Sequence, residues 1–155
     1  METRSHIHEE SFDVPPERMF ELLVTPSAIR GWWGASRVIV VPRVDGVWAA
    51  AWGDEDDPDY ISTATLVGFD PPRRLVMKYG KYHAKSGPLP FEFAEDALTT
   101  FTVEPSGEGC MLRVEQSGFP ADPIADQFYA ACETGWKNTF EGIRKYVAEK
   151  TETRV

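Results

Sequence analysis

The segment that most constrains the fold is the last one, where a single long helix is expected. Asp122 followed by Pro123 predicts its start, because Asp is favoured at helix N-caps and proline in the first turn. An apolar stripe follows to about Glu149, with residues that recur every three or four positions, at Phe128, Cys132, Trp136, Thr139, Phe140, Ile143, Tyr146 and Val147. A stripe of this length must be buried, and the only large apolar partner that the chain offers is one face of a sheet.

Seven segments are expected to form strands, some from alternating polarity and others, such as residues 38–41, from a short apolar run. Short turns such as Asp45-Gly46 connect most of them, which favours antiparallel pairing. The segments cover residues 5–12, 38–41, 47–52, 60–69, 75–79, 98–104 and 110–115. Residues 80–96 read as a long connection, and residues 151–155 are expected to fray.

Two short helices are expected after the first strand. Residues 13–17 predict the start of one, since its two prolines suit a first turn whose amides lack partners in any case. Thr25 and Pro26 fit the N-cap and the first position of the other, and Gly34 ends it. Its apolar face is formed by Ile29, Trp32 and Trp33.

This order of elements predicts an α+β fold in which a curved antiparallel sheet wraps around the long C-terminal helix. The two short helices would close one end of the space between them. No repeat or linker divides residues 1–155, so we expect one domain with an ordered core at about 6–149. A chain of this length can bury ~70% of its unfolded surface, which is enough for a substantial core.

Charge and composition exclude several classes of partner. The net charge of −9, from 25 acidic and 16 basic residues, argues against nucleic acid and anionic membranes, both of which need a basic face. No apolar run follows the N-terminus and no stretch of 18 apolar residues occurs. Cys110 and Cys132 show no metal-binding spacing. We therefore expect a cytoplasmic protein with reduced thiols and neither metal nor cofactor.

Tryptophan provides the main indication of a binding site. Large rigid rings pack less closely than aliphatic side chains, so clusters of them often border a cavity or an interface. The alternative is that the rings fill a core made irregular by the curvature of the sheet. The residues expected to bind a small hydrophobic molecule are Trp32, Trp33, Trp48, Trp52, Met77, Tyr79, Phe101, Leu112, Phe128, Cys132 and Trp136.

Other chemistry has weaker support. Glu10 is the main candidate for a catalytic acid or base, because it lies two residues from Phe12 and shares its face of the strand. His8 and the tyrosines are the other candidates for an acid–base pair, and Tyr79 and Tyr82 could supply phenolic donors to a ligand. His6 and His8 also share a face, but no third metal ligand has a suggestive spacing. The acidic residues at 54–59 lack a calcium-loop pattern and fit a solvated hairpin tip.

A set of motifs together resembles the SRPBCC superfamily, also called START-like or birch-pollen-allergen-like, in the branch of the heat-shock chaperone ATPase activator homologues. The resemblance covers roughly residues 6–148 and implies a helix-grip fold. The motifs are FDVPPERMF at 12–20, TP at 25–26, IRGWWG at 29–34, RVDGVW at 43–48, DPPRRLV at 70–76, QSGF at 116–119 and GWKNTFEGI at 135–143. Each motif is weak alone, whereas their order and spacing are specific.

The resemblance says less about function, because its motifs mark turns, caps and core positions rather than catalytic groups. Three functions stay open: binding of a small hydrophobic ligand in an internal cavity, cyclase-, aromatase- or hydrolase-type catalysis in the same cavity, and regulation of a chaperone ATPase. Residues 80–96 depart from the family pattern and would form a lid or a dimer contact. Phe91 and Phe93 could pair with a second copy in a homodimer.

Overall fold

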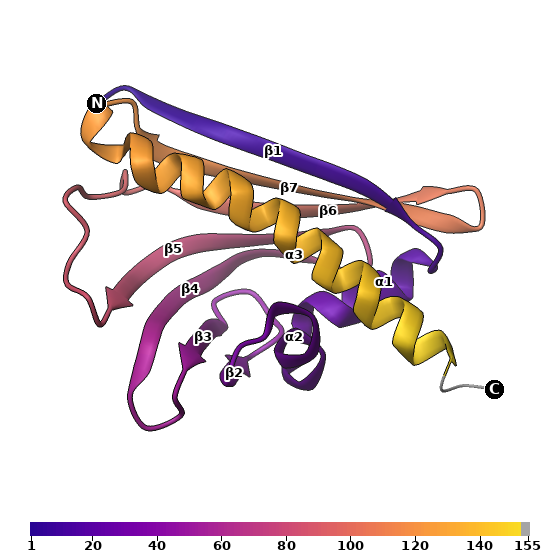
Figure 1. Ribbon diagram of the computed structural model, residues 1–155. Coiled ribbons are helices and arrows are strands. Elements are labelled where there is room, and N and C mark those ends of the chain that lie inside the picture. Colours follow the sequence, from indigo (N-terminus) through magenta and orange to yellow (C-terminus); the bar gives the residue numbers. More distant parts are fainter. Residues whose placement is uncertain (153–155) are drawn as a thin grey trace.

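A seven-stranded antiparallel sheet wraps around one long helix in the computed structural model, which describes residues 1–152 (Figure 1). This arrangement confirms the α+β, helix-grip prediction. In chain order the elements are β1 (Thr3–Phe12), α1 (Pro16–Val24), α2 (Pro26–Trp33), β2 (Arg37–Val40), β3 (Val47–Gly53), β4 (Pro58–Asp70), β5 (Arg74–Ala84), β6 (Leu98–Ser106), β7 (Gly109–Pro120), the 3-10 turn η1 (Pro123–Ala125) and α3 (Asp126–Glu152).

The strand order is β1-β7-β6-β5-β4-β3-β2, and every pair is antiparallel. Strands β2 to β7 follow one another as neighbours, and β1 adds to the free side of β7. Strands β1 and β2 are therefore the two edges. Helix α3 lies across the concave side of the sheet, and α1 and α2 gather near its C-terminal end (Figure 1).

The pairing register of the described sheet shifts at four places, and two of these β-bulges, on β5 and β7, determine which side chains reach the concave face. Opposite β4, Tyr79 pairs with Ala64 and Tyr82 with Ser62, so β5 carries one residue more than its partner. An extra residue restores the inward direction one position later than strict alternation allows. Tyr79 and Tyr82, three apart, consequently both face the concave side, where they line the same cavity.

The second bulge lies on β7. Phe119 pairs with Arg4 of β1 and Gln116 with His6, which again leaves one extra residue between the two partners. Gly118 has a φ of 89°, a backbone conformation that glycine adopts without the steric cost that other residues incur. Gln116 and Phe119 are thereby both turned toward α3 and line the cavity with the two tyrosines.

The apolar stripe of α3 is divided between two environments. From the middle of the helix onward, Phe140 and Ile143 are buried in the main core. Nearer its N-terminus, Phe128 and Cys132 are only partly buried and border a cavity, and the buried Trp136 contributes to both the core and the cavity wall. Burial of the stripe against the sheet thus leaves space beside the N-terminal half of the helix.

Helices α2 and α3 pack at very close range. A Cβ atom placed on Gly142 of α3 would collide with the backbone carbonyl oxygen of Trp32, and one placed on Gly31 of α2 would collide with the Tyr146 ring. Glycine at both positions lets the two helices approach closely. The approach brings the C-terminal residue of α2, Trp33, against Trp136 of α3.

Some expected boundaries differ from the structure. Strand β5 continues to Ala84, so the long connection begins at residue 85 rather than 80. The last helix begins with the turn η1, whose N-cap Asp122 accepts a hydrogen bond from the amide of Ile124 at 2.9 Å, and α3 continues to Glu152. Thr25 occupies the N-cap of α2 without forming a side-chain cap bond. The expected fraying of residues 151–155 falls partly on residues 153–155, which lie outside the described chain.

Candidate functional site

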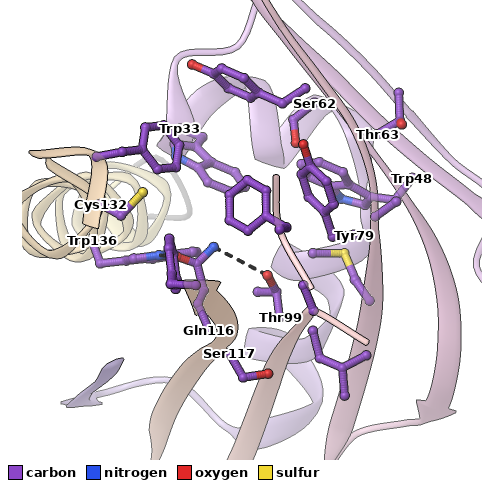
Figure 2. A pocket seen from close by; sticks show the side chains of 18 of the residues that line it. Trp33, Trp48, Ser62, Thr63, Tyr79, Thr99, Gln116, Ser117, Cys132 and Trp136 are labelled. Atoms are coloured by element: carbon purple, nitrogen blue, oxygen red, sulfur yellow. Dashed lines mark hydrogen bonds between the residues drawn. The ribbon is translucent and has the colours of Figure 1, made fainter. Parts of the chain in front are cut away.

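A cavity of about 190 Å³ lies between the N-terminal half of α3 and the concave face of the sheet (Figure 2). Its walls come from the end of α2, strands β3 to β7, the connection between β5 and β6, and α3. The lining residues are Trp33, Trp48, Trp52, Ser62, Thr63, Ala64, Met77, Tyr79, Tyr82, Phe93, Ala97, Leu98, Thr99, Gln116, Ser117, Phe119, Phe128, Cys132 and Trp136.

Trp33 is the centre of a cluster that includes all five tryptophans. It stacks on Trp32, with ring centroids 5.1 Å apart and planes 15° from parallel. Its ring also lies 5.8 Å from Trp48, 5.4 Å from Trp52 and 5.4 Å from Trp136. Pairs of this kind contribute ~0.5–1.5 kcal/mol each beyond the area that they bury. One wall of the cavity is therefore rigid and apolar.

A second aromatic cluster forms the opposite wall. Phe93 comes from the connection between β5 and β6. The centroid of its ring lies 4.3 Å from that of Tyr79, 5.4 Å from that of Phe119 and 5.9 Å from that of Phe128. Phe91 packs on Phe93 and Phe128. The rings expected to meet a second copy of the chain are thus engaged within this one, and the homodimer stays a prediction.

One chain of hydrogen bonds runs along the cavity wall. The indole Nε1 of Trp136 donates to Oε1 of Gln116 at 2.8 Å. Nε2 of Gln116 in turn donates to Oγ1 of Thr99 at 3.3 Å, the bond that is dashed in Figure 2. Gln116 and Thr99 are direct partners in the register of β6 and β7. This chain fixes one polar position on a lining that also includes the hydroxyl-bearing residues Ser62, Thr63, Tyr79, Tyr82 and Ser117.

The lining residues carry no side chain that is ionised at neutral pH. No carboxylate, ammonium, guanidinium or imidazole group occurs among them. Burial raises the pKa of Tyr82 to about 12 and that of Cys132 to about 12, and it raises the pKa of Tyr79 as well. These phenols and the thiol are consequently protonated, and the chamber is uncharged.

The structure brings most of the predicted binding residues together. Three of them do not line the cavity: Trp32 donates its Nε1 proton to the carbonyl of Leu22 at 2.8 Å, and Phe101 and Leu112 are fully packed in the core. Whether the others contact a ligand stays a prediction. The eight that line the cavity are Trp33, Trp48, Trp52, Met77, Tyr79, Phe128, Cys132 and Trp136.

Sequence reasoning did not place Gln116, Phe119 and Phe93 at the site, and it offered Tyr82 only as a phenolic donor. Strict alternation puts Tyr82 on the opposite face from Tyr79, and the bulge reverses this. Gly118, immediately before Phe119, was the available signal, because glycine within a strand often marks a bulge. Phe93 lies in an irregular connection, for which periodicity gives no direction.

Glu10 does face α3 with Phe12, as expected, but it lies outside the cavity. Its Oε1 accepts a hydrogen bond from the Arg144 guanidinium at 2.9 Å, and its side chain is 39% exposed. Arg144 also stacks over the Phe12 ring at 4.6 Å. These contacts give Glu10 a role in joining β1 to α3.

The two histidines of β1 form a pair beside the cavity wall. Nε2 of His8 lies 3.2 Å from Nδ1 of His6, and the His6 ring is buried between Phe119 and Tyr129. Burial lowers the pKa of both, and the positive charge of a protonated His8 lowers that of His6 further. Within residues 1–152, no three histidine, cysteine or acidic side chains cluster so as to hold a metal ion.

Two basic side chains of the same chain offset part of the negative charge at the acidic hairpin tip. Lys85 Nζ lies 2.6 Å from Asp57 and 3.9 Å from Asp59, and Arg37 approaches Asp56 at 4.0 Å. The carboxylates are exposed, as expected for a solvated turn. Cys110 is buried, and burial raises its pKa to about 11, so it behaves as a core residue.

The fold and the cavity between α3 and the sheet define a START-like domain. Residues 13–148 match the model of the family described as activator of Hsp90 ATPase homolog 1-like protein, and the chain belongs to this family, a branch of the SRPBCC superfamily. A search of curated proteins finds no significant match. No helix in residues 1–152 is long and apolar enough to cross a membrane.

Several solved structures share the fold. Protein MLL2253 from Mesorhizobium loti is 24% identical, with 94% of this chain and 98% of that one covered and a TM-score of 0.75. The Aha1 dimer from Colwellia psychrerythraea is 13% identical, with 91% and 93% covered and a TM-score of 0.68. CalU16 from Micromonospora echinospora is 16% identical, with 97% and 80% covered and a TM-score of 0.66. These likenesses establish the architecture alone.

Proposed function

We propose that this protein binds a small, largely apolar, uncharged molecule in the cavity between α3 and the sheet. The observation that carries the proposal is a cavity of about 190 Å³ whose lining includes nine aromatic side chains and one polar position that is fixed by hydrogen bonds. Binding pockets combine apolar walls with a few placed polar groups in this way.

The volume limits the size of the ligand. An engineered apolar cavity of about 150 Å³ in another protein binds benzene or xenon, and typical drug-sized ligands need about 300–1,000 Å³. A space of about 190 Å³ therefore suits a molecule only slightly larger than a single ring.

The chemistry of the walls favours binding over acid–base catalysis. A cyclase-type reaction needs a group that takes or gives a proton near neutral pH. Burial keeps the Tyr82 phenol and the Cys132 thiol protonated, with pKa values of about 12. Glu10 is held by Arg144 outside the lining residues.

A cavity-filling variant tests the proposal. Ala64 lines the cavity between its neighbours Trp48 and Tyr79, so Ala64→Phe would place a ring in the space that a ligand needs. The matched control is Thr65→Phe, which adds the same ring at the next, exposed position of β4. Native mass spectrometry of freshly purified protein, and titration with small aromatic probes, should show binding in the wild type and control only. Equal binding by all three proteins would contradict the proposed site.

The family match favours a second candidate function, stimulation of a chaperone ATPase. This role requires a docking surface rather than an internal cavity, so Ala64→Phe should leave it intact. An ATPase assay with the Hsp90 of the same organism would test it. Stimulation by both the wild type and Ala64→Phe would support the regulator, and no stimulation by either would exclude it.

A further inference from the structure

The hydrogen bonds on the cavity wall have only one possible direction. An indole N–H can donate but cannot accept, so the group of Gln116 that faces Trp136 at 2.8 Å must be its amide oxygen. The amide nitrogen of Gln116 then faces Thr99, to which it donates at 3.3 Å. The neighbours of Gln116 therefore determine which end of its amide is the oxygen and which is the nitrogen.

This direction determines what Thr99 presents to the cavity. Its Oγ1 accepts from Gln116, so its own O–H proton is left to donate elsewhere. None of the hydrogen bonds formed by residues 1–152 uses that proton, and Thr99 lines the cavity. The hydroxyl proton of Thr99 is therefore available to a ligand that carries a hydrogen-bond acceptor.

We propose that the cavity selects a neutral, single-ring aromatic molecule whose oxygen atom accepts a hydrogen bond from the Thr99 hydroxyl. The inference rests on the proposed binding function and specifies the class of ligand. The volume of about 190 Å³ sets one ring with a short substituent as the size, and the aromatic walls favour a planar molecule. The absence of charge among the lining residues disfavours a carboxylate, because an ion would lose its hydration without gaining a partner.

Thr99→Val tests the hydrogen bond with little change of shape, since both side chains are branched at Cβ. The matched control is Thr100→Val, at the next position and on the opposite face of β6. The probes are acetophenone, which accepts a hydrogen bond, and cumene, which has nearly the same shape but no oxygen. Benzoate tests whether the cavity excludes a charged ligand, and 1-decanol tests whether it excludes a long chain. Binding is followed by NMR, using the indole N–H signals, among which that of Trp136 reports directly on the wall.

The expected result is that the wild type and Thr100→Val bind acetophenone, and that Thr99→Val binds it about two- to tenfold more weakly, the range for one neutral hydrogen bond. Cumene should bind Thr99→Val at least as well as the wild type, which also shows that the variant is folded. Benzoate should bind the wild type more weakly than acetophenone.

Three results would overturn the inference. Equal acetophenone affinity in Thr99→Val and the wild type would mean that another group, such as a tyrosine hydroxyl, contacts the oxygen. Binding of 1-decanol or benzoate in preference to acetophenone would refute the ligand class while leaving the proposed binding function in place. Failure of every probe to bind would contradict both.

Discussion

The close crossing of α2 and α3 makes a prediction that two glycines of the same helix can test. Gly142→Ala would direct a Cβ atom into the backbone carbonyl oxygen of Trp32, which cannot move unless the whole of α2 shifts. Gly135→Ala, two turns earlier on α3, would direct its Cβ into open space, because no atom lies within 4 Å.

The two substitutions share one contribution to stability. Replacing a helical glycine by alanine adds about 1 kcal/mol through helix propensity, so Gly135→Ala should stabilise the protein by that amount. Gly142→Ala has the same gain but also forces overpacking, at a cost of about 1–3 kcal/mol, with the upper part of the range expected because the obstacle is backbone. The difference between the variants isolates the steric cost.

Urea denaturation measures both effects. At an unchanged slope, the midpoint should rise for Gly135→Ala and fall for Gly142→Ala relative to the wild type. Displacement of α2 should also alter tryptophan fluorescence in Gly142→Ala alone, since Trp33 contacts Trp136 across the two helices. Equal midpoints for the two variants would show that the helices are not packed as closely as described.

Two further changes have expected outcomes. Gly118→Ala should be destabilised by strain at a φ of 89° and by collision of the new Cβ with Ala97. Its free energy of unfolding should fall by about 1–3 kcal/mol more than that of Gly107→Ala, a control position with a positive φ but open space around it. Equal urea midpoints for the two variants would contradict this expectation. Because the native pKa values of His6 and His8 are lowered from 6.5, the unfolded chain binds more protons in acid, so stability is fully present above about pH 6.5 and is lost as the pH falls through the lowered values. Urea midpoints measured across that range should fall more steeply for the wild type than for His6→Phe, and parallel curves would refute the assignment.

The sequence predicted the order and type of the elements because their signals are local. The apolar stripe of the last helix, the prolines that begin α1 and α2, and the alternation in β3, β6 and β7 all depend on a few neighbouring residues. The boundaries were less accurate. The β4–β5 hairpin extends beyond its expected end to Ala84, because the bulge between Tyr79 and Tyr82 interrupts the alternation on which the prediction relied.

The cavity was harder to predict, because its walls depend on pairing between distant strands. Trp32 and Trp33 fall on the same apolar face by spacing, yet Trp32 is fixed in the core by Leu22 and only Trp33 reaches the cavity. The polar wall depends on the register of β6 and β7, which brings Thr99 opposite Gln116. No local pattern contains that register.

The bulges on β5 and β7 have a consequence for how relatives of this chain should be compared. A relative that lacks the extra residue at either place would keep the same strand partners and the same inward positions, but would reach them one residue earlier in its sequence. At identities of 13–24%, equivalent wall positions must be matched by superposed backbones, since an ungapped alignment would compare residues that point in opposite directions.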